Sequence, residues 1–456
     1  MLVLFVFTTT QKYKLLYMTF AFRLYMTSKP NNFVVGDSIP LEEFIVMGPR
    51  SKVFRDTKYF GDDYIPVDYL KKYRSGQIQK ISDNMQWLLE DDPTSGGMEN
   101  NIFVYGPPST GKTHVVKALC HQYTSKIMEM ANRLGATVTR HVVYIRASNV
   151  TPAGIIYLLA QYFNDGIPRR GISTDEMVER TMDSIRGHRV CIILDEFDKV
   201  SRTKQHQNPV DYIIRKCIDL SSEPDVSLSL VIVANDYSTL ASINEATDSR
   251  FLPVREPFPK YDAQEIGDIL WDRCVRGFVE GVIDEGDVNR FASDIYNTGR
   301  DIRTGLKVFM ECGRQAERNG RSTITWDDLE RSLDHVERNR LSNTICKLDN
   351  ASFLIYYAMA LACRTNMQND EKPHGFATSG ELQQIYGQLC RKYTFKQLTW
   401  HHIAYYVLPS LEQMGLFMHH PGHRGQPSRY EVDDKLLDNI VAIAQDEIKR
   451  RRRGWV

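Results

Sequence analysis

The sequence has no excess of charge of either sign, since Lys plus Arg and Asp plus Glu each number 57 among 456 residues. This balance excludes an acidic halophile-type surface and a uniformly basic protein that coats nucleic acid, but it leaves room for a local basic face. Charged residues make up 25% and hydrophobic residues 42% of the chain, which excludes a largely disordered or collagen-like protein. At about 100 to 200 residues per domain, we expect two to four domains.

Cysteine is scarce, and its eight positions stand singly with no C-x-x-C or other metal-ligand spacing. We therefore expect a reduced cytosolic compartment, with each cysteine buried as a small apolar side chain. The sequence also contains no metal-ligand cluster, nucleophile triad or deaminase signature, so it does not support those chemistries.

Long hydrophobic runs are absent as well. The apolar stretch at residues 1–7 is far shorter than the about 20 residues that span a bilayer, and it has neither a preceding basic segment nor a following cleavage site. We expect no signal peptide and no membrane span. We interpret residues 1–50 as a leader, partly disordered or reflecting a start codon assigned too far upstream, with Met18 and Met26 as alternative starts.

Strands and helices alternate from residue 101 to residue 236, and the apolar runs at 191–194 and 228–234 suit parallel strands buried on both faces. This alternation predicts an α/β fold, a three-layer sandwich with a parallel sheet. Helical spacing replaces the strand pattern after residue 259, and near the C-terminus helices precede a Gly- and Arg-containing turn between two short extended runs, the order of a winged helix. The expected units are the leader at 1–50, an α/β nucleotide-binding domain at 51–260, an α-helical lid at 261–350 and a winged helix at 351–456.

Residues 106–113 read GPPSTGKT and match the phosphate-loop pattern G-x-x-x-x-G-K-[ST] between a predicted strand and a predicted helix. Backbone N–H groups of such a loop and the helix N-terminus bind phosphates. Lys112 would reach the β- and γ-phosphates of ATP, and the Thr113 hydroxyl would ligate Mg²⁺. Ser109 stands where many such loops carry a third glycine, and we expect it to stiffen the loop. The predicted nucleotide contacts here are Gly106, Pro107, Pro108, Ser109, Thr110, Gly111, Lys112 and Thr113.

Polar side chains end the two buried strands that follow the loop. Asp195 and Glu196 end the run VCIILD, where an aspartate holds the Mg²⁺ shell and a glutamate orients the attacking water. The pair therefore predicts hydrolysis in addition to binding. Asn235 ends the next strand, from which it would bond the γ-phosphate or the lytic water.

Two arginines further along the chain are candidates for sensing the γ-phosphate. Arg250 in ATDSRF stands where an arginine reaches the nucleotide of a neighbouring subunit, with a solvated loop arginine as the alternative. Arg303 in GRDIRTGLKVF begins an amphipathic helix of the predicted lid and would fold over the nucleotide.

The ordered set GPPSTGKT, LDEFD, VAND, DSRF and GRDIR resembles the AAA+ ATPases. The intervening segments look like one branch, the archaeal initiators related to origin recognition complex subunit one and cell division control protein six. The segment VFRDTKYFGDDYIP is similar to the family's lead-in, which implies that Tyr64, Ile65 and Pro66 contact adenine. Residues 147–186 look like the initiator-specific helical insert. The departures are Ser109, RSGQ at 74–77 where acidic residues commonly follow the arginine, and a winged helix that is not strongly basic.

In a winged helix, one helix enters the major groove and the hairpin wing reaches the backbone or the minor groove. The candidate helix spans 399–413, and Pro409 within it should kink or shorten it. Lys plus Arg exceed Asp plus Glu by only 13 to 10 over residues 351–456, so we expect a salt dependence below about ten released counterions. The predicted DNA contacts are Trp400, His401, His402, Arg424 and Arg429 in the winged helix and Arg169 and Arg170 in the insert.

The resemblance implies an ATP-dependent replication initiator that uses ATP/ADP and Mg²⁺, binds double-stranded origin DNA, and helps to recruit or load the replicative minichromosome maintenance helicase. A second copy of the initiator on the DNA, a cytoplasmic, nucleoid-associated location and no membrane partner are further expectations. Two alternatives stay open: an AAA+ protein remodeller or transposition-type helicase loader, and a DNA-binding regulator with a structural nucleotide. The sequence does not separate a chromosomal from a plasmid or viral initiator.

Overall fold

The computed structural model describes residues 51–90, 97–134, 139–164, 166–169, 171–203, 208–222, 225–368, 375–422 and 427–453. The predicted leader at residues 1–50 lies outside these ranges. All eight cysteines are described and none forms a disulfide, and most of them are buried.

A parallel sheet forms the centre of the α/β region. Its strands are β1 (Ile102–Tyr105), β2 (Arg140–Arg146), β3 (Arg189–Asp195), β4 (Ser227–Ala234) and β5 (Val254–Pro257), in the order β2-β3-β4-β1-β5. Every neighbouring pair is parallel, which confirms the predicted sheet. β5 was not predicted, because the short edge strand VREP carries two charged residues and no apolar run.

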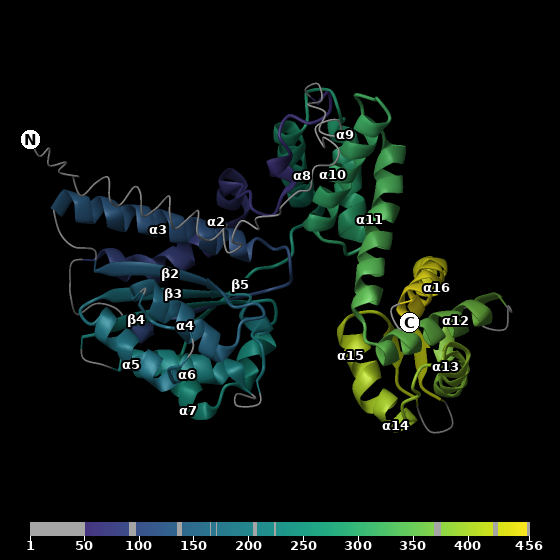
Figure 1. Cartoon of the computed structure of the whole chain (residues 1–456). Helices are drawn as coiled ribbons and strands as arrows, with labels where there is room; N and C mark the ends of the chain where they lie inside the picture. The colour runs from purple at the N-terminus through teal and green to yellow at the C-terminus, as the bar shows by residue number, and fades with distance from the viewer. Residues whose placement is uncertain are drawn as a thin grey trace, which may run out of the picture. The chain divides into compact units, whose positions relative to one another are not determined.

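Two helical layers cover the two faces of the sheet (Figure 1). α2 (Val67–Met85) and α3 (Lys112–Leu134) pack on one face, against Ile102 and Val104. α4 (Pro152–Phe163), α5 (Thr174–Ile185) and α6 (Pro209–Ser221) pack on the other, against Phe103, and α7 (Glu245–Phe251) follows them. Successive strand residues point to opposite faces, so strands buried on both sides need the continuous apolar runs seen in the sequence.

The helical region after the sheet contains α8 (Ala263–Gly277), α9 (Glu285–Asn297), α10 (Ile302–Arg318) and α11 (Trp326–Lys347). Side-chain caps begin these helices: Asp262 forms a capping box with Glu265, and Asp301 caps α10. Phe60 of the lead-in is buried among the apolar side chains of these helices. The lead-in thus contributes to the core of the helical region although it precedes the sheet in the chain.

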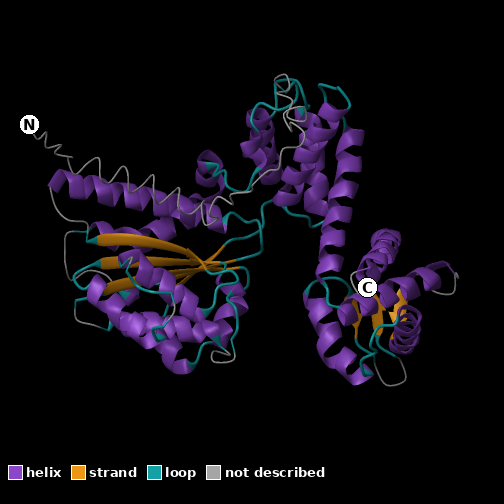
Figure 2. Cartoon of the chain, viewed as in Figure 1, coloured by secondary structure: helices purple, strands orange, loops and turns teal. Residues whose placement is uncertain are grey.

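The C-terminal region combines helices with a small antiparallel sheet (Figure 2). The order is α12 (Asn350–Gln368), β6 (Phe376–Thr378), α13 (Ser379–Tyr393), the helix from α14 (Trp400–His402) to α15 (Leu408–Gln413), β7 (Met418–His420), β8 (Arg429–Glu431) and α16 (Leu437–Arg453). The strands pair in the order β6-β8-β7. This arrangement confirms the predicted winged helix.

The prediction that Pro409 kinks or shortens the candidate DNA helix is wrong about the helix length. A π-helical segment, Ile403–Val407, joins α14 to α15, so the helix continues to Gln413. Proline lacks the N–H for an intrahelical bond, and the wider turn before it accommodates this loss. Ile403, Val407 and Leu411, each four residues apart, are buried and form the core-facing side of this helix.

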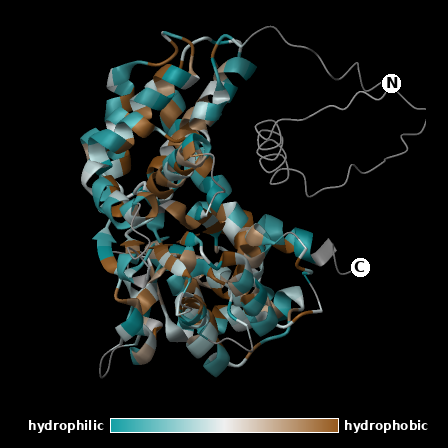
Figure 3. Ribbon diagram, turned by 90° about the vertical axis from the view of Figure 1, so that its left-hand side faces the viewer, coloured by the Kyte–Doolittle hydropathy of each residue, from teal (hydrophilic) through white to brown (hydrophobic). Residues whose placement is uncertain are grey.

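Hydrophobic and hydrophilic residues alternate along the helices, which gives each surface helix an apolar and a polar side (Figure 3). No helix among the described residues combines the length and the apolar character that a membrane crossing requires.

Candidate nucleotide site

The phosphate loop follows β1 and leads into α3. Gly106 has φ +147°, and a Cβ atom there would lie 2.2 Å from the carbonyl oxygen of Phe258. Gly111 has φ +91°, and its Cβ would lie 2.6 Å from the Tyr261 hydroxyl. Both positions therefore require glycine, for conformation and for space.

Ser109 adopts the left-handed conformation, with φ +63°. This conformation costs a non-glycine residue roughly 1 to 2 kcal/mol. The Ser109 hydroxyl donates a hydrogen bond to Asp301 Oδ2 at 3.1 Å, a contact that glycine cannot make. Ser109 thus links the phosphate loop to the N-cap of α10.

The amine of Lys112 is buried inside the loop. Its Nζ donates to the carbonyl oxygens of Gly106 at 2.6 Å and Pro107 at 2.7 Å. Burial lowers the pKa of Lys112 to about 8, although Asp198 and Asp195 oppose this change. A phosphate group in the loop would supply the opposite charge that the amine lacks among its carbonyl partners.

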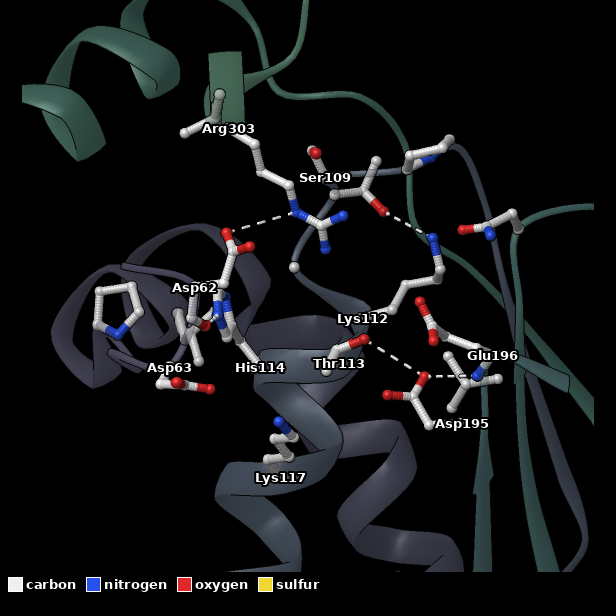
Figure 4. A pocket seen from close by; sticks show the side chains of 18 of the residues that line it. Asp62, Asp63, Ser109, Lys112, Thr113, His114, Lys117, Asp195, Glu196 and Arg303 are labelled. Atoms are coloured by element: carbon white, nitrogen blue, oxygen red, sulfur yellow. Dashed lines mark hydrogen bonds and ion pairs between the residues drawn. The ribbon is translucent and has the colours of Figure 1, made fainter. Parts of the chain in front are cut away.

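Asp195 lies at the carboxyl end of β3, where three donors hold its carboxylate. Oδ1 accepts from the Thr113 hydroxyl at 3.3 Å and from the Glu196 backbone N–H at 2.9 Å, and Oδ2 accepts from the Tyr144 hydroxyl at 2.6 Å (Figure 4). Mg²⁺ takes oxygen ligands and keeps several waters, and adjacent ligands at about 2.1 Å from it lie about 3 Å apart. The Thr113 and Asp195 oxygens fit that spacing, although no group of three His, Cys, Asp or Glu suited to a metal occurs in the described part of the chain.

Glu196 is held by two cations next to the cavity. Its backbone is left-handed, with φ +55°. Its carboxylate accepts from Arg146 Nε at 2.6 Å and from Lys199 Nζ at 3.0 Å. Burial raises the pKa of Glu196, but these hydrogen bonds outweigh it and hold the pKa at about 2. The carboxylate is therefore ionised at neutral pH.

Asn235 follows β4 and bonds a second acidic residue of the site. Its backbone N–H donates to Asp198 Oδ1 at 3.2 Å, and its Nδ2 donates to Asp198 Oδ2 at 3.0 Å. Both residues line the cavity beside Glu196. The side chains that end β3 and β4 thus meet at one edge of the sheet.

Arg303 reaches the site from the first turn of α10. Its Nε forms an ion pair with Asp62 Oδ1 at 3.8 Å, and its side chain lines the cavity (Figure 4). In the chain, Asp62 of the lead-in precedes the phosphate loop and Arg303 of the helical region follows it. The pair places a guanidinium at the cavity while leaving about half of its side chain exposed.

The predicted adenine contacts do not all lie at the cavity. Pro66 lines it, whereas Tyr64 and Ile65 are absent from its lining. The guanidinium of Arg273 stacks on the Tyr64 ring at 4.4 Å, and Ile65 packs against the core under α2 and α3. The apolar wall comes instead from residues of α2, α8, α10 and the segment before α8: Tyr69, Leu70, Ile269, Ile302, Leu306 and Tyr261.

The cavity has a volume of about 310 Å³. Motif residues from the loop, β3, β4 and α10 surround it, with Lys112 and Thr113 beside Asp195 and Glu196 (Figure 4). Several lining residues were not predicted: Asp62, His114, Lys117, Tyr144, Arg146, Asp198 and Arg273. Arg146 could have been predicted from the sequence, because it ends the strand next to β3. Side chains at the carboxyl ends of neighbouring parallel strands lie at the same edge of the sheet.

Arg250 lies away from this cavity. It is exposed on α7, and its guanidinium donates to the Ser222 hydroxyl at 2.8 Å. The prediction that it reaches a neighbouring subunit's nucleotide stays a prediction.

The predicted DNA contacts are surface residues where the structure describes them. His401 and His402 are exposed at the start of the π-containing helix, whereas Trp400 is partly buried against the C-terminal core. Arg429 is exposed on β8, with its guanidinium 4.5 Å from the Phe376 ring centroid. Arg169 is exposed between α4 and α5. Arg170 and Arg424 lie outside the described residues.

Two tyrosines that the sequence analysis missed extend this surface. Tyr405 and Tyr406 are 68% and 65% exposed. Their rings lie 4.5 Å from that of His401 and 5.0 Å from that of His402, respectively. The spacing of four residues that brings each pair together was visible in the sequence.

A parallel sheet with a phosphate loop, an Asp-Glu pair at the end of β3 and a helical region that supplies an arginine defines an AAA+ nucleotide-binding protein. In agreement, the family model of the AAA domain matches residues 97–238.

Comparison with known proteins extends the likeness beyond this domain. The ORC1-type DNA replication protein 1 of Sulfurisphaera tokodaii is 24% identical over 415 residues, which cover 90% of this chain and 97% of the relative. The Aeropyrum pernix ORC1 protein, solved in complex with DNA, has a TM-score of 0.68 at 22% identity, covering 88% of this chain and 100% of its own. The Aeropyrum pernix ORC2 protein, solved in ADPNP-ADP complexes, has a TM-score of 0.52 at 19% identity, covering 87% and 100%.

These findings confirm the resemblance predicted from the motifs. The chain contains an AAA domain and is similar to archaeal ORC1-type DNA replication proteins along most of its length.

Proposed function

We propose that this chain is an ATP-gated replication initiator that binds duplex DNA at an origin and helps to recruit or load the replicative helicase. The observation that carries the proposal is a complete phosphate site joined, in one chain, to a helical lid and a winged helix. The nucleotides and the DNA in the two Aeropyrum pernix structures support the same ligands for this chain.

ATP would bind through the phosphate loop. Lys112 would transfer its hydrogen bonds from the loop carbonyls to the β- and γ-phosphates, and the loop N–H groups would hold the β-phosphate. Thr113 and Asp195 would hold Mg²⁺, which neutralises developing charge on the phosphates when bound. The apolar wall around Leu306 would contact the base.

Hydrolysis would depend on Glu196 and Asn235. The ionised Glu196 carboxylate would accept a hydrogen bond from the attacking water, and Asn235 would orient that water from the neighbouring strand. Glu196 would first have to give up part of its ion pairing with Arg146 and Lys199, so we expect slow turnover. Such an enzyme would act as a switch, because loss of the γ-phosphate would remove the contact that we expect Arg303 to make with it.

DNA binding would use two separate elements. The helix that begins at Trp400 would enter the major groove with His401 and His402 in front, and Arg429 would contact the backbone with Arg424. Arg169 and Arg170 would contribute a second, insert-borne contact. The small positive excess in residues 351–456 supports binding through a few placed side chains.

The helicase partner and a second initiator copy on the DNA rest on the family resemblance, as does a cytoplasmic, nucleoid-associated location. Arg250 is the candidate for contact with a second copy, because it is exposed and away from its own chain's cavity.

Replacing Lys112 by Ala tests the nucleotide role. Removing the amine should weaken ATP binding at least about 100-fold, because the phosphates would lose the buried cation that is expected to bind them. Fluorescence titration with a labelled ATP analogue measures the affinity, and circular dichroism verifies the fold. Unchanged affinity in a folded Lys112→Ala protein would refute the assignment.

Footprinting on the protein's own replicon separates the alternatives. Protection of a repeated element, different with ATP and with ADP, supports the initiator. Uniform weak protection favours a protein remodeller or helicase loader, and a zero hydrolysis rate with and without DNA favours a regulator with a structural nucleotide.

A further inference from the structure

The segment that connects β5 to α8, residues 258–261, lies against both ends of the phosphate loop. The Phe258 N–H donates to the Tyr105 carbonyl at 2.7 Å, just before the loop begins. The close approaches at Gly106 and Gly111 involve the Phe258 carbonyl and the Tyr261 hydroxyl. This hinge segment, as we name residues 258–261, is therefore in direct contact with the loop before it enters the helical region.

A buried arginine joins the same two segments by hydrogen bonds. Arg74 Nε donates to the Thr110 carbonyl at 3.1 Å, and Nη2 donates to the Pro259 carbonyl at 2.8 Å. The guanidinium lies 3.9 Å from the ring centroid of Tyr261. Only 3% of Arg74 is exposed, and its backbone, at φ −128°, departs from helical values inside α2.

These contacts are costly to build and specific to arginine. A buried charge loses its hydration, which only several well-placed partners offset. The planar fork of arginine donates in two directions at once and stacks on an aromatic face. A lysine amine at this position has one nitrogen, so it cannot bridge Thr110 and Pro259 with the same geometry.

We propose that Arg74 is a positioning residue that couples the phosphate loop to the lid through the hinge segment. Arg74 does not line the cavity, so it acts through Thr110 on one side and through Pro259 and Tyr261 on the other. A change in loop conformation on nucleotide binding then moves the hinge segment, and with it α8 and Arg303. The inference rests on the proposed nucleotide switch and names how that switch is transmitted.

Single-molecule energy transfer on the full chain tests the coupling. Dyes attached through non-natural amino acids at exposed Leu134 on α3 and exposed Tyr296 on α9 report the distance between sandwich and lid without touching the cavity. The probe is the slowly hydrolysed analogue ATPγS at saturating concentration. The wild-type protein should change its transfer efficiency when ATPγS binds.

Arg74→Lys should lose most of that change at saturation and bind ATPγS about tenfold more weakly, the usual size of coupling between two sites. Arg189→Lys is the matched control, because Arg189 is a buried arginine that donates to the carbonyls of Trp87 at 2.8 Å and Glu90 at 2.7 Å. The control should keep the wild-type change. A full change in saturated Arg74→Lys would overturn the inference.

Two further outcomes keep the inference separate from the proposed function. A wild-type protein that binds no ATPγS contradicts the proposed function, whereas binding without any change in distance overturns the coupling alone. If Arg74→Lys does not fold, Tyr261→Leu replaces it, since it removes the ring under the guanidinium and keeps the Thr110 and Pro259 carbonyls as acceptors. It should lose about half of the distance change, and a full change would again overturn the coupling.

Discussion

The phosphate loop and the π-containing helix of the winged-helix region hold their functional side chains in opposite ways. In the phosphate site, Lys112 of the loop is 6% exposed and bonded to carbonyls, and Asp195 at the end of β3 is 2% exposed and accepts hydrogen bonds from three donors. In the helix, His401 and Tyr405 are exposed, and their rings lie against each other. The first arrangement fixes a reacting group before its substrate arrives. The second leaves side chains free to adapt to a large, hydrated partner.

Substitutions at the two places should therefore have effects of different size. Substitutions in the buried site should change chemistry by large factors, because they remove groups that nothing replaces. Substitutions on the exposed helix should change affinity by small factors, since each side chain is one of several contacts.

The largest effect is expected for Glu196→Gln. The amide keeps the shape but cannot act as a general base, so the ATP hydrolysis rate should fall about 100-fold or more while ATP binding and DNA binding persist. Phosphate release measures the rate, and Glu179→Gln, an exposed change on α5, is the control. A rate within twofold of wild type would remove Glu196 from the mechanism.

The exposed helix should respond more weakly. Replacing both His401 and His402 by Ala should weaken duplex binding about tenfold and leave the hydrolysis rate without DNA unchanged. Fluorescence anisotropy with an origin duplex measures the affinity. His335→Ala, an exposed histidine on α11, serves as the control and should behave as wild type. Equal affinity in the double variant would place the DNA surface elsewhere.

The buried lysine should give ATP binding a pH dependence. Lys112 is charged below its pKa of about 8 and neutral above it, and a bound phosphate favours the charged form. ATP affinity should therefore be constant below pH 7 and fall as pH rises through 8, by up to about tenfold per unit. Titrations from pH 6 to 9.5 test this. Lys112→Arg, whose charge persists, should flatten the profile wherever it still binds ATP.

The smallest effect concerns the left-handed Ser109. Ser109→Ala loses the hydrogen bond to Asp301 and keeps the strain, whereas Ser109→Gly loses the bond and relieves the strain. The free energy of unfolding should be about 1 kcal/mol lower for the alanine variant than for the glycine variant. Thermal unfolding compares the two, and equal stabilities would show that the strain is absent in solution.

The long strands and the phosphate loop were predictable because local pattern determines them. An apolar run such as Cys191 to Leu194 fits a strand that is buried on both faces. The sequence GPPSTGKT fits a phosphate-binding loop between a strand and a helix. β5 and β6 were missed, since strands as short as VREP and FAT are set by pairing with neighbours and not by their own sequence.

For the same reason, only part of the candidate site could be predicted from the sequence. The ends of strands indicated Asp195 and Asn235, but the partners that orient them, Tyr144 and Asp198, come from tertiary packing. Tyr64 was expected at the base and instead lies under Arg273, because a family likeness gives a segment and not the direction of each side chain.

The π-helical segment Ile403–Val407 also affects how this helix can gain or lose residues in evolution. A π-turn holds one residue more than an α-turn, so the extra residue is absorbed within the turn and the helix continues beyond it in the same direction. Deleting one residue here would restore a regular turn and leave Glu412 and Gln413 facing the same side as before. The segment thus gives the helix a point at which one residue can be lost without redirecting the proposed DNA surface on either side of it.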